Sequence, residues 1–371
     1  MRIAHIEAGR HLYGGAAQVR YLMEGLTSHG VENLLLCPPG SELGAAAPAA
    51  RIVELPMRGE LDVALLPRLA RQLKRLQPDL VHVHSRRGAD LYGGFAAALA
   101  GIPAVLTRRV DAAEPALLAR LKYRPYRVVV ALSLAIERQL RAAGVAPERL
   151  LLIPSAVDTR RYRPAAGARA RLLAAFDLPA DALVVGVVAQ LIERKRHSWL
   201  LALLPNLLRE CPQLKVVCFG RGPLEERLRH ELTRLALTDC VTFAGFRRDL
   251  PELLPGLDLL VHPAEREGLG LALLEAASAG VAVVACAVGG VPDVVVDGET
   301  GVLVQRDDAV ALRGAIARLL GAPQERRRLG AQARRHVERR FDTARLVAEH
   351  LALYTRLLAE PAAAPAPPVF R

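Results

Sequence analysis

The chain is 371 residues long and 52% apolar, so it can bury the cores of two domains of ordinary size. This length and a charged fraction of 24% exclude a small disulfide-stapled module and a disordered chain. The formal net charge of +12 is concentrated in residues 1–165, which hold 23 Lys and Arg against 14 Asp and Glu. The surplus indicates either an anionic partner of this half or the codon usage of a GC-rich genome, since all but four of the basic residues are Arg.

Short apolar runs alternate with amphipathic segments along the whole chain, a pattern typical of βαβ units and parallel sheets. In the first half, strands are predicted at 2–7, 33–37, 80–84, 104–107 and 128–131. In the second half, they are predicted at 183–189, 214–220, 241–244, 257–262, 281–285 and 301–304. Helices are predicted to follow at 309–320, 324–340 and 343–358.

A stretch punctuated by Pro154, Pro164 and Gly167 separates the two series of strands and suits an interdomain linker. We therefore place a domain boundary near residue 165. The predicted parts are a first domain at 1–165, a second at 166–340, a C-terminal helix at 341–358 that has the option of crossing back to the first domain, and a Pro/Ala tail at 359–371.

The cellular location follows from what the sequence lacks. The five cysteines form no C-x-x-C pair, so neither a disulfide framework nor a zinc site is predicted. Glu7 stands where a signal peptide needs its apolar run, and the uncharged stretch 276–292 is short for a membrane span. We expect a cytoplasmic protein, with attachment to the inner face of the cytoplasmic membrane as an option.

The positive charge also raises the question of a nucleic-acid partner. No recognised nucleic-acid-binding motif accompanies the basic charge, which disfavours nucleic acid as a partner.

The most informative segment is EREGLGLALLEAA at 265–277. Gly268 and Gly270 precede an apolar helical run, so the backbone N–H groups of 268–271 are expected at a helix N-terminus, which favours a phosphate. Glu267 and Glu275 lie eight positions apart, too far for one close pair but suited to two hydroxyl clusters of an extended ligand. Spacing alone equally allows a helix-capping Glu267 and a solvated Glu275.

The pattern E-G-x-G-L-x-x-x-E-A at 267–276, with the strand-rich segment that follows, resembles the signature of retaining glycosyltransferases of family 4. Other landmarks occur in the family's order: the pair Gly14 and Gly15 after the first strand, a strand ending in His84, PSAVDTRRYRP, and VAQLIERK. The resemblance covers essentially the whole chain. It implies an α/β protein of the GT-B fold, with two Rossmann-like doubly wound domains facing a central cleft, the first for the acceptor and the second for a nucleotide sugar.

The resemblance also implies roles for individual residues. Glu267 would contact hydroxyls of the donor sugar, Glu275 the ribose, and Lys195 the diphosphate, so Glu267 and Lys195 are the expected catalytic residues. The expected donor-binding residues are Gly14, Gly15, Gln190, Arg194, Lys195, Glu267, Gly268, Leu269, Gly270, Leu271 and Glu275. His84 and Arg109 are expected near the acceptor or the sugar.

Two departures from the family pattern affect this site. Gln190 stands where the family usually has an Arg five residues before the Lys, with Arg194 as a substitute. Arg109 occupies the place where many relatives carry a His, so no catalytic role of that His transfers to this chain.

The implied activity is retaining transfer of a hexose from a UDP-, GDP- or ADP-linked donor to a glycan or lipid-linked acceptor (EC 2.4). Lys195 and the glycine N–H groups would stabilise the leaving diphosphate, so no metal and no cofactor are expected. Family and charge favour bacterial lipopolysaccharide or surface-polysaccharide synthesis, with an anionic membrane surface as a further partner. The alternatives are a GT-B sugar-nucleotide epimerase and a non-catalytic nucleotide-sugar-binding subunit.

Two weaker signals lie in the first half. His82 and His84 alternate on one strand and so project to one face, but no third ligand of obvious spacing accompanies them, and no metal site is predicted. Basic amphipathic stretches at 61–77 and 116–127 indicate either core-packed helices with a solvated basic face or a surface for anionic lipid or a phosphorylated acceptor.

Overall fold

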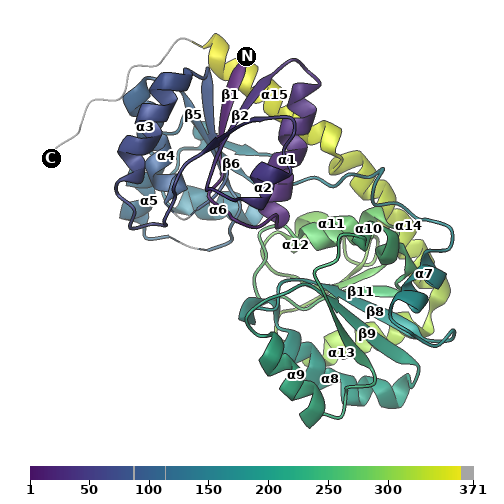
Figure 1. The fold of residues 1–371 in the computed structure, drawn as a ribbon. Coiled ribbons are helices and arrows are strands. Elements are labelled where there is room, and N and C mark those ends of the chain that lie inside the picture. The colour runs from purple at the N-terminus through teal and green to yellow at the C-terminus, as the bar shows by residue number, and fades with distance from the viewer. Residues whose placement is uncertain (87, 113, 361–371) are drawn as a thin grey trace. The chain divides into compact units, whose positions relative to one another are not determined.

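A computed structural model describes residues 1–86, 88–112 and 114–360 of the chain (Figure 1). The chain divides into two compact units, of which the second comprises Ser155–Asp342 and the first comprises the described residues before and after it. Each unit contains one parallel sheet with helices packed on it, as the alternation of apolar runs and amphipathic segments predicts.

The first unit is built on a seven-stranded sheet of order β3-β2-β1-β4-β5-β6-β7. Its strands are β1 (Arg2–Ile6), β2 (Glu32–Cys37), β3 (Arg51–Glu54), β4 (Leu80–Val83), β5 (Ala104–Arg108), β6 (Val128–Ala131) and β7 (Leu150–Leu152). Its helices are α1 (Gly14–Thr27), α2 (Glu42–Ala45), α3 (Leu65–Leu76), α4 (Ala89–Ala100), α5 (Ala116–Tyr123), α6 (Leu134–Ala142) and α15 (Thr343–Ala359). The order reverses between β1 and β4, which is where doubly wound sheets place ligands beyond the carboxyl ends of the strands.

The second unit is built on a six-stranded sheet of order β10-β9-β8-β11-β12-β13. Its strands are β8 (Leu183–Val188), β9 (Leu214–Phe219), β10 (Val241–Gly245), β11 (Leu259–His262), β12 (Val283–Cys286) and β13 (Val302–Val304). Its helices are α7 (Ala168–Ala175), α8 (His197–Glu210), α9 (Glu225–Arg234), α10 (Leu250–Leu253), α11 (Leu271–Ser278), α12 (Val291–Val294), α13 (Ala309–Gly321) and α14 (Pro323–Arg340). Here the order reverses between β8 and β11.

The predicted strands are confirmed, with ends that differ by one or two residues. The prediction missed the edge strands β3 and β7. Strand β3 is largely exposed and has a charged residue at each end, Arg51 and Glu54. Strand β7 has only three residues. Neither strand therefore stands out in the sequence as a buried apolar run. Both strands lie at an edge of the sheet, where only one of the two neighbouring strand positions is filled, so their side chains can be less buried than those of central strands.

The stretch expected to be a linker is instead part of the second unit. The Val157 N–H donates to the Phe341 carbonyl at 2.8 Å, and the side chains of Val157 and Tyr162 are buried. The C-terminal helix α15 belongs to the first unit, where the buried Tyr354 hydroxyl lies 2.5 Å from His82 Nδ1. None of the described helices combines the length and the apolarity needed to cross a membrane.

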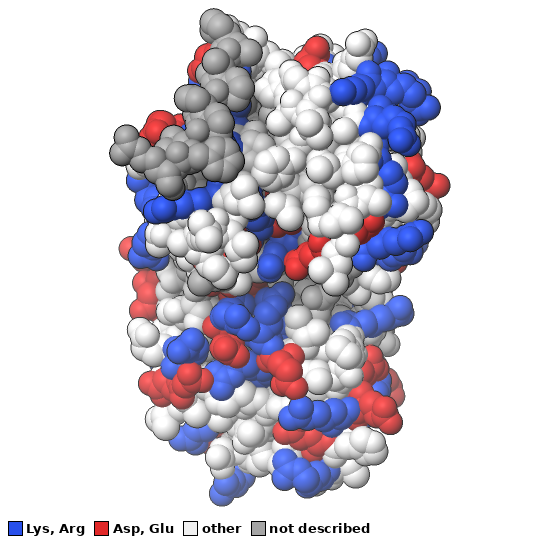
Figure 2. All heavy atoms as spheres, turned by 90° about the vertical axis from the view of Figure 1, so that its left-hand side faces the viewer, with Lys and Arg blue, Asp and Glu red and all other residues white. Residues whose placement is uncertain are grey.

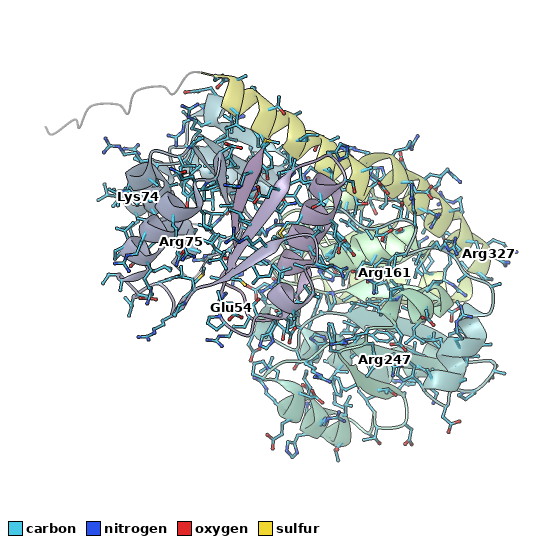
Figure 3. The ribbon with its side chains drawn as sticks, turned by 45° about the horizontal axis from the view of Figure 1, so that its top comes forward. Glu54, Lys74, Arg75, Arg161, Arg247 and Arg327 are labelled. Carbon is cyan, nitrogen blue, oxygen red and sulfur yellow. The ribbon has the colours of Figure 1, made fainter. Side chains whose placement is uncertain are left out.

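The two basic amphipathic stretches differ in the structure. On α3 the leucine stripe of Leu65, Leu69 and Leu73 is fully buried, and Lys74 and Arg75 point away from the unit (Figure 3), so its core-packed interpretation is confirmed. On α5 the inward residues are Ala119 and Tyr123, and the leucines lie outside. Of the two alternatives for this stretch, the structure does not support a core packed by these leucines, and the surface for an anionic partner stays a prediction.

Candidate active site

Three ionisable side chains from different elements meet in the second unit. Lys195 ends the short 3-10 turn before α8, His262 ends β11, and Glu267 lies in the loop before α11. Lys195 Nζ forms an ion pair with Glu267 Oε2, and His262 Nε2 lies 3.0 Å from the same oxygen. The two catalytic residues expected from the sequence, 72 positions apart, are thus in direct contact.

The electrostatics of this cluster follow from its burial. Burial by itself raises the pKa of Glu267, but the charge of Lys195 and hydrogen bonds from His262 and Lys195 outweigh it and hold the pKa below its usual value. Burial lowers the pKa of Lys195, and the charge of Glu267 opposes this only in part. Burial also lowers the pKa of His262, whose Nε2–H donates to the Glu267 carboxylate. The carboxylate is kept ionised and oriented.

The start of α11 supplies backbone donors beside the cluster. Gly270 adopts φ 99°, and a Cβ there would lie 2.7 Å from Leu273 Cδ1, so this position requires glycine. The Gly268 N–H lies 3.2 Å from Glu267 Oε1, while Leu269 is buried in the core and Leu271 begins the helix. The Leu273 N–H donates to the Gly270 carbonyl at 3.0 Å. The first N–H groups of a helix have no carbonyl four residues before them within the helix, which suits a helix N-terminus to an anion.

Arg194 joins the two loops of this site. Its carbonyl accepts a hydrogen bond from the Glu265 N–H at 2.8 Å, and its guanidinium donates to the Arg266 carbonyl at 3.2 Å. Gln190 lies in the same loop, between β8 and the 3-10 turn that holds Lys195, and is partly exposed.

Glu275 lies on α11 in surroundings of its own. Its neighbours are Tyr162, which hydrogen-bonds to its carboxyl, and Arg161. Burial raises the pKa of the Glu275 carboxyl to about 7 despite these two neighbours. Glu267 and Glu275 share none of these partners, so they form two separate acceptors, as their spacing predicts.

The first unit holds a pocket of about 260 Å³ at the carboxyl ends of β1, β4 and β5. Gly15, in the first turn of α1 directly after Gly14, lies on its wall, and a Cβ at Gly15 would contact Arg109 Cδ at 3.5 Å. His84 and Arg109 also line the pocket, with Arg109 Nη2 lying 3.4 Å from His84 Nδ1. Three of the four residues expected in the first unit, Gly15, His84 and Arg109, thus line one pocket, and Gly14 precedes Gly15 at the start of α1.

A third histidine joins the pair expected on one strand face. The rings of His82 and His84 lie 3.8 Å apart between centroids, and a ligand atom of His5 lies within 4.8 Å of theirs. No obvious spacing in the sequence links His5 to this pair. It joins them because β1 and β4 are neighbours in the sheet and pair His5 with His82.

Hydrogen bonds occupy every ring nitrogen of this trio. His82 contacts Tyr354 and Thr107, while His84 and His5 bond to each other at 3.0 Å. The remaining nitrogens face Arg109 and Asn33. Burial lowers the pKa of His5 to about 4 and the pKa values of His82 and His84 well below their usual value. A metal would have to displace these partners, so the trio fits a neutral hydrogen-bonded network better than a metal site.

Sequence reasoning missed His262 and His5. Each lies on a predicted strand, and His262 stands five positions before Glu267, a signal that the pattern contained. For His5 the only sequence signal is a polar residue within an apolar strand; its contact with His84 depends on which strands are neighbours.

Comparisons with known proteins agree with this geometry. The family model for glycosyl transferases group 1 matches residues 169–336, and that for glycosyltransferase family 4 matches residues 13–161. A GDP-mannose-dependent alpha-(1-6)-phosphatidylinositol monomannoside mannosyltransferase of Mycolicibacterium smegmatis is 34% identical over 194 residues, 49% of this chain and 50% of that protein. A D-inositol 3-phosphate glycosyltransferase of Salinispora tropica is 36% identical over 229 residues, 58% of this chain and 47% of that protein. The chain spans about half the length of the curated relatives it matches.

Solved structures show the same fold at low sequence identity. Anabaena HepE in complex with UDP-glucose has a TM-score of 0.85 at 20% identity, covering 96% of this chain and 100% of that one. WaaG, a glycosyltransferase involved in lipopolysaccharide biosynthesis, has a TM-score of 0.74 at 17% identity, covering 95% and 99%. With one family model on each unit and two parallel Rossmann-like sheets, the chain belongs to the group 1 glycosyltransferases of family 4 and has the GT-B fold.

Proposed function

We propose that the chain is a retaining hexosyltransferase that moves a sugar from a nucleotide-sugar donor to a glycan or glycolipid acceptor. The observation that carries this proposal is the buried contact of Lys195, Glu267 and His262 beside the N-terminus of α11. The relatives named above support the donor class, since HepE was solved with UDP-glucose and the mannosyltransferase is named as GDP-mannose-dependent.

In this proposal the leaving diphosphate is the group that the site stabilises. Lys195 supplies a compact positive charge, and the N–H groups at the start of α11 supply fixed dipoles. They stabilise the negative charge that develops on the phosphate, and the site does not have to reorganise for this. Glu267, held ionised by its neighbours, accepts hydroxyl groups of the sugar. A phosphate oxygen of the leaving group takes the acceptor proton on the same face, which retains the anomeric configuration and needs no protein base, metal or cofactor.

A panel of UDP-, GDP- and ADP-sugars tests this function. We expect one donor to raise the melting temperature, because ligand at a hundred times its Kd stabilises a protein by about 2.7 kcal/mol. With a glycan or glycolipid acceptor, NMR of the product should show the donor's anomeric configuration. Turnover of the sugar nucleotide to an epimer without acceptor, or donor binding with no transfer to any acceptor, would favour the two alternatives instead.

Donor binding is expected to release a proton near neutral pH. The pKa of Glu275 is about 7 in the free protein, and ribose hydroxyls that donate to its carboxylate favour the ionised form. The donor should therefore bind more tightly as pH rises from about 5 to 7 and reach a plateau above that. Calorimetry in buffers of different ionisation enthalpy measures the released proton, and Glu275→Gln should abolish it. An unchanged proton release in this variant would contradict the assignment of Glu275 to the ribose.

We also propose that the acceptor is met at an anionic membrane surface, as in lipopolysaccharide or surface-polysaccharide synthesis. On α5, Leu117, Leu118 and Leu121 are 80%, 61% and 52% exposed, and Arg120 and Arg124 beside them are exposed as well. Figure 2 views the side on which α3 and α5 lie in Figure 1, and its Lys and Arg side chains gather in several clusters separated by uncharged surface and by Asp and Glu. Exposed leucines flanked by arginines suit the boundary between lipid headgroups and acyl chains.

Vesicle binding tests the role of α5. The triple variant Leu117→Ser, Leu118→Ser and Leu121→Ser should bind vesicles of anionic phospholipid at least tenfold more weakly than the unchanged chain, since burying a leucine contributes about 1.5–3 kcal/mol. Val310→Ser removes a side chain that is 74% exposed on α13 and should change nothing. Equal binding of the triple variant, or equal binding of the unchanged chain to neutral vesicles, would contradict the proposal.

A further inference from the structure

We propose that the pocket of the first unit binds a phosphomonoester group carried by the acceptor, through the guanidinium groups of Arg10, Arg86 and Arg109. This inference rests on the proposed function for the identity of the phosphate's carrier. The site itself combines an excess of positive charge, unpaired guanidinium donors, an oriented Arg109 and a small volume.

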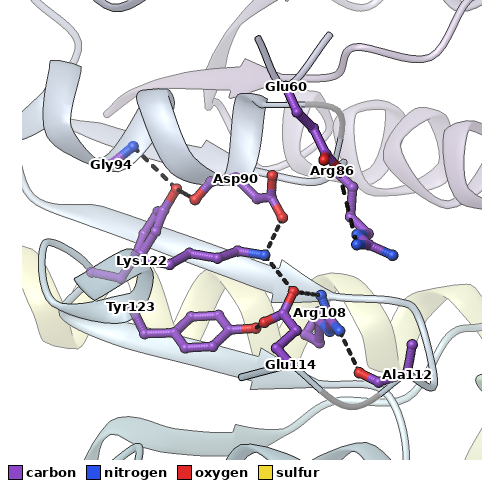
Figure 4. A network of polar contacts seen from close by, with 10 residues as sticks. Glu60, Arg86, Asp90, Gly94, Arg108, Ala112, Glu114, Lys122 and Tyr123 are labelled. Carbon is purple, nitrogen blue, oxygen red and sulfur yellow. Dashed lines mark hydrogen bonds and ion pairs between the residues drawn. The ribbon is translucent and has the colours of Figure 1, made fainter. Parts of the chain in front are cut away.

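The charge of the pocket is positive and only partly balanced. Its described lining residues include four arginines and two carboxylates, Glu7 and Asp90. Asp90 is paired with Lys122, and the guanidinium of Arg108 lies 2.8 Å from Glu114, so both are engaged outside the pocket (Figure 4). Glu7 Oε1 accepts the Gly9 N–H at 2.8 Å and opposes part of the charge of Arg109. The three positive charges of Arg10, Arg86 and Arg109 exceed the two negative charges of Glu7 and of Glu60, which lies near Arg86.

Two of these guanidinium groups have donors without acceptors. The Nε atoms of Arg86 and Arg109 are shielded from solvent, and neither has a hydrogen-bond partner among the described residues. The closest ion pair of Arg86 is a 4.0 Å contact of Nη2 with Glu60 (Figure 4). A buried donor left unpaired costs free energy, and an oxyanion in the pocket would remove that cost at both arginines. The planar guanidinium fork also matches the geometry of phosphate oxygens.

A chain of hydrogen bonds orients Arg109. A guanidinium can only donate, so Nδ1 of His84 must accept from Arg109, and its Nε2–H then donates to Nδ1 of His5. The Nε2–H of His5 in turn donates to Asn33 Oδ1 at 3.0 Å, and the Asn33 amide donates to the Met23 carbonyl at 3.1 Å. Both rings are thus single tautomers and uncharged. His84 is a positioning residue that holds Arg109 in the pocket without adding charge of its own.

The pocket has room for a small phosphorylated group. Pockets for drug-sized ligands have volumes of about 300–1,000 Å³, whereas this one is about 260 Å³. This volume suits the phosphate and ring of one sugar or cyclitol. A phosphomonoester dianion presents three terminal oxygens, which matches three guanidinium groups.

Calorimetric binding to the full chain tests the inference. The probes are inorganic phosphate, inositol 3-phosphate and glucose 6-phosphate, with inositol and glucose as unphosphorylated controls and UDP as a donor-site probe. We expect the phosphorylated probes to bind at least tenfold more tightly than their parents. Arg86→Gln and Arg109→Gln should each weaken phosphate-probe binding about tenfold to a hundredfold, while leaving UDP affinity unchanged. The matched variant Arg75→Gln, on the exposed face of α3, should leave both affinities unchanged.

Several outcomes would overturn the site. If the phosphorylated probes bind no more tightly than inositol and glucose, the pocket has no preference for a phosphate group. If Arg75→Gln loses as much affinity as the pocket variants, the binding is due to general surface charge and not to the pocket. A loss of UDP affinity in the pocket variants, with the phosphate probes unaffected, would assign the pocket to the donor's diphosphate. Arg109→Lys keeps the charge in a smaller side chain and should retain part of the affinity if folding is intact. If the unchanged chain fails to bind any nucleotide but binds the phosphate probes, only the proposed function fails.

Discussion

Replacing Lys195 with alanine is expected to lower kcat by roughly two to three orders of magnitude, with a much smaller change in the KM of the donor. The reason is that charge builds up on the leaving diphosphate only as the glycosidic bond breaks, so a cation beside it stabilises the transition state more than the bound donor. Lys195 is buried and its ammonium is paired with Glu267. A water molecule that filled the space left by the substitution would carry no charge, so it could not stabilise the leaving diphosphate as the ammonium does.

Steady-state kinetics with the donor identified from the panel would measure this effect. The chain has one other lysine in the second unit, Lys215, whose ammonium donates to the Asp239 carbonyl at 2.8 Å, and Lys215→Ala is the matched control. Loss of the buried ion pair also destabilises the fold, so melting temperatures must show that Lys195→Ala is folded at the assay temperature. A folded variant with unchanged kcat would contradict the assignment of Lys195 to the leaving group.

Replacing Glu114 with alanine is expected to lower the free energy of unfolding by about 3 kcal/mol. The carboxylate of Glu114 accepts from Arg108 Nη1 and Lys122 Nζ, both at 2.8 Å, and from the Tyr123 hydroxyl at 2.6 Å (Figure 4). Its removal leaves two largely buried cations without their shared partner, although Lys122 keeps its contact with Asp90. The loss should also loosen α5, since Lys122 and Tyr123 both belong to this helix.

The stabilisation that Glu114 contributes depends on pH, because its pKa differs between the folded and unfolded states. Burial opposes ionisation of Glu114, but hydrogen bonds from Lys122 and Tyr123 and the nearby cations lower its pKa to about 2, against an ordinary value of 4.5. The unfolded state therefore takes up the proton first, and the stabilisation is fully present above pH 4.5 and is lost as pH falls toward 2.

Chemical denaturation at several pH values would measure the difference. The gap in unfolding free energy between the unchanged chain and Glu114→Ala should narrow below pH 4.5. Glu225→Ala removes a surface pair with Arg229 on α9 and should have little effect at any pH. A loss for Glu114→Ala no larger than for this control would show that the network contributes little.

Much of the fold could be predicted because both sheets are parallel and buried on two faces. Strands such as β4 and β6 are buried at every residue, so their sequences, LVHV and VVVA, are mostly aliphatic and stand out between amphipathic helices. The edge strand β3 escaped the prediction because its residues are largely exposed. The leucines of α5 misled it, because an amphipathic pattern shows that a helix has an apolar face but not that another element covers it.

The sequence by itself determined the family, the two Rossmann-like units and the residues of the E-G-x-G-L-x-x-x-E-A pattern, since these depend on local spacing and on the period of apolar residues. Only the tertiary structure decided which of those residues touch. The contact of Lys195 with Glu267 spans 72 residues, and that of His5 with His84 spans 79. Both arise because the strand order reverses beside the first strand of each sheet, which brings distant loops to one edge. The excess of positive charge was visible in the composition, but the free donors of Arg86 and Arg109 became visible only once burial and hydrogen bonding were known.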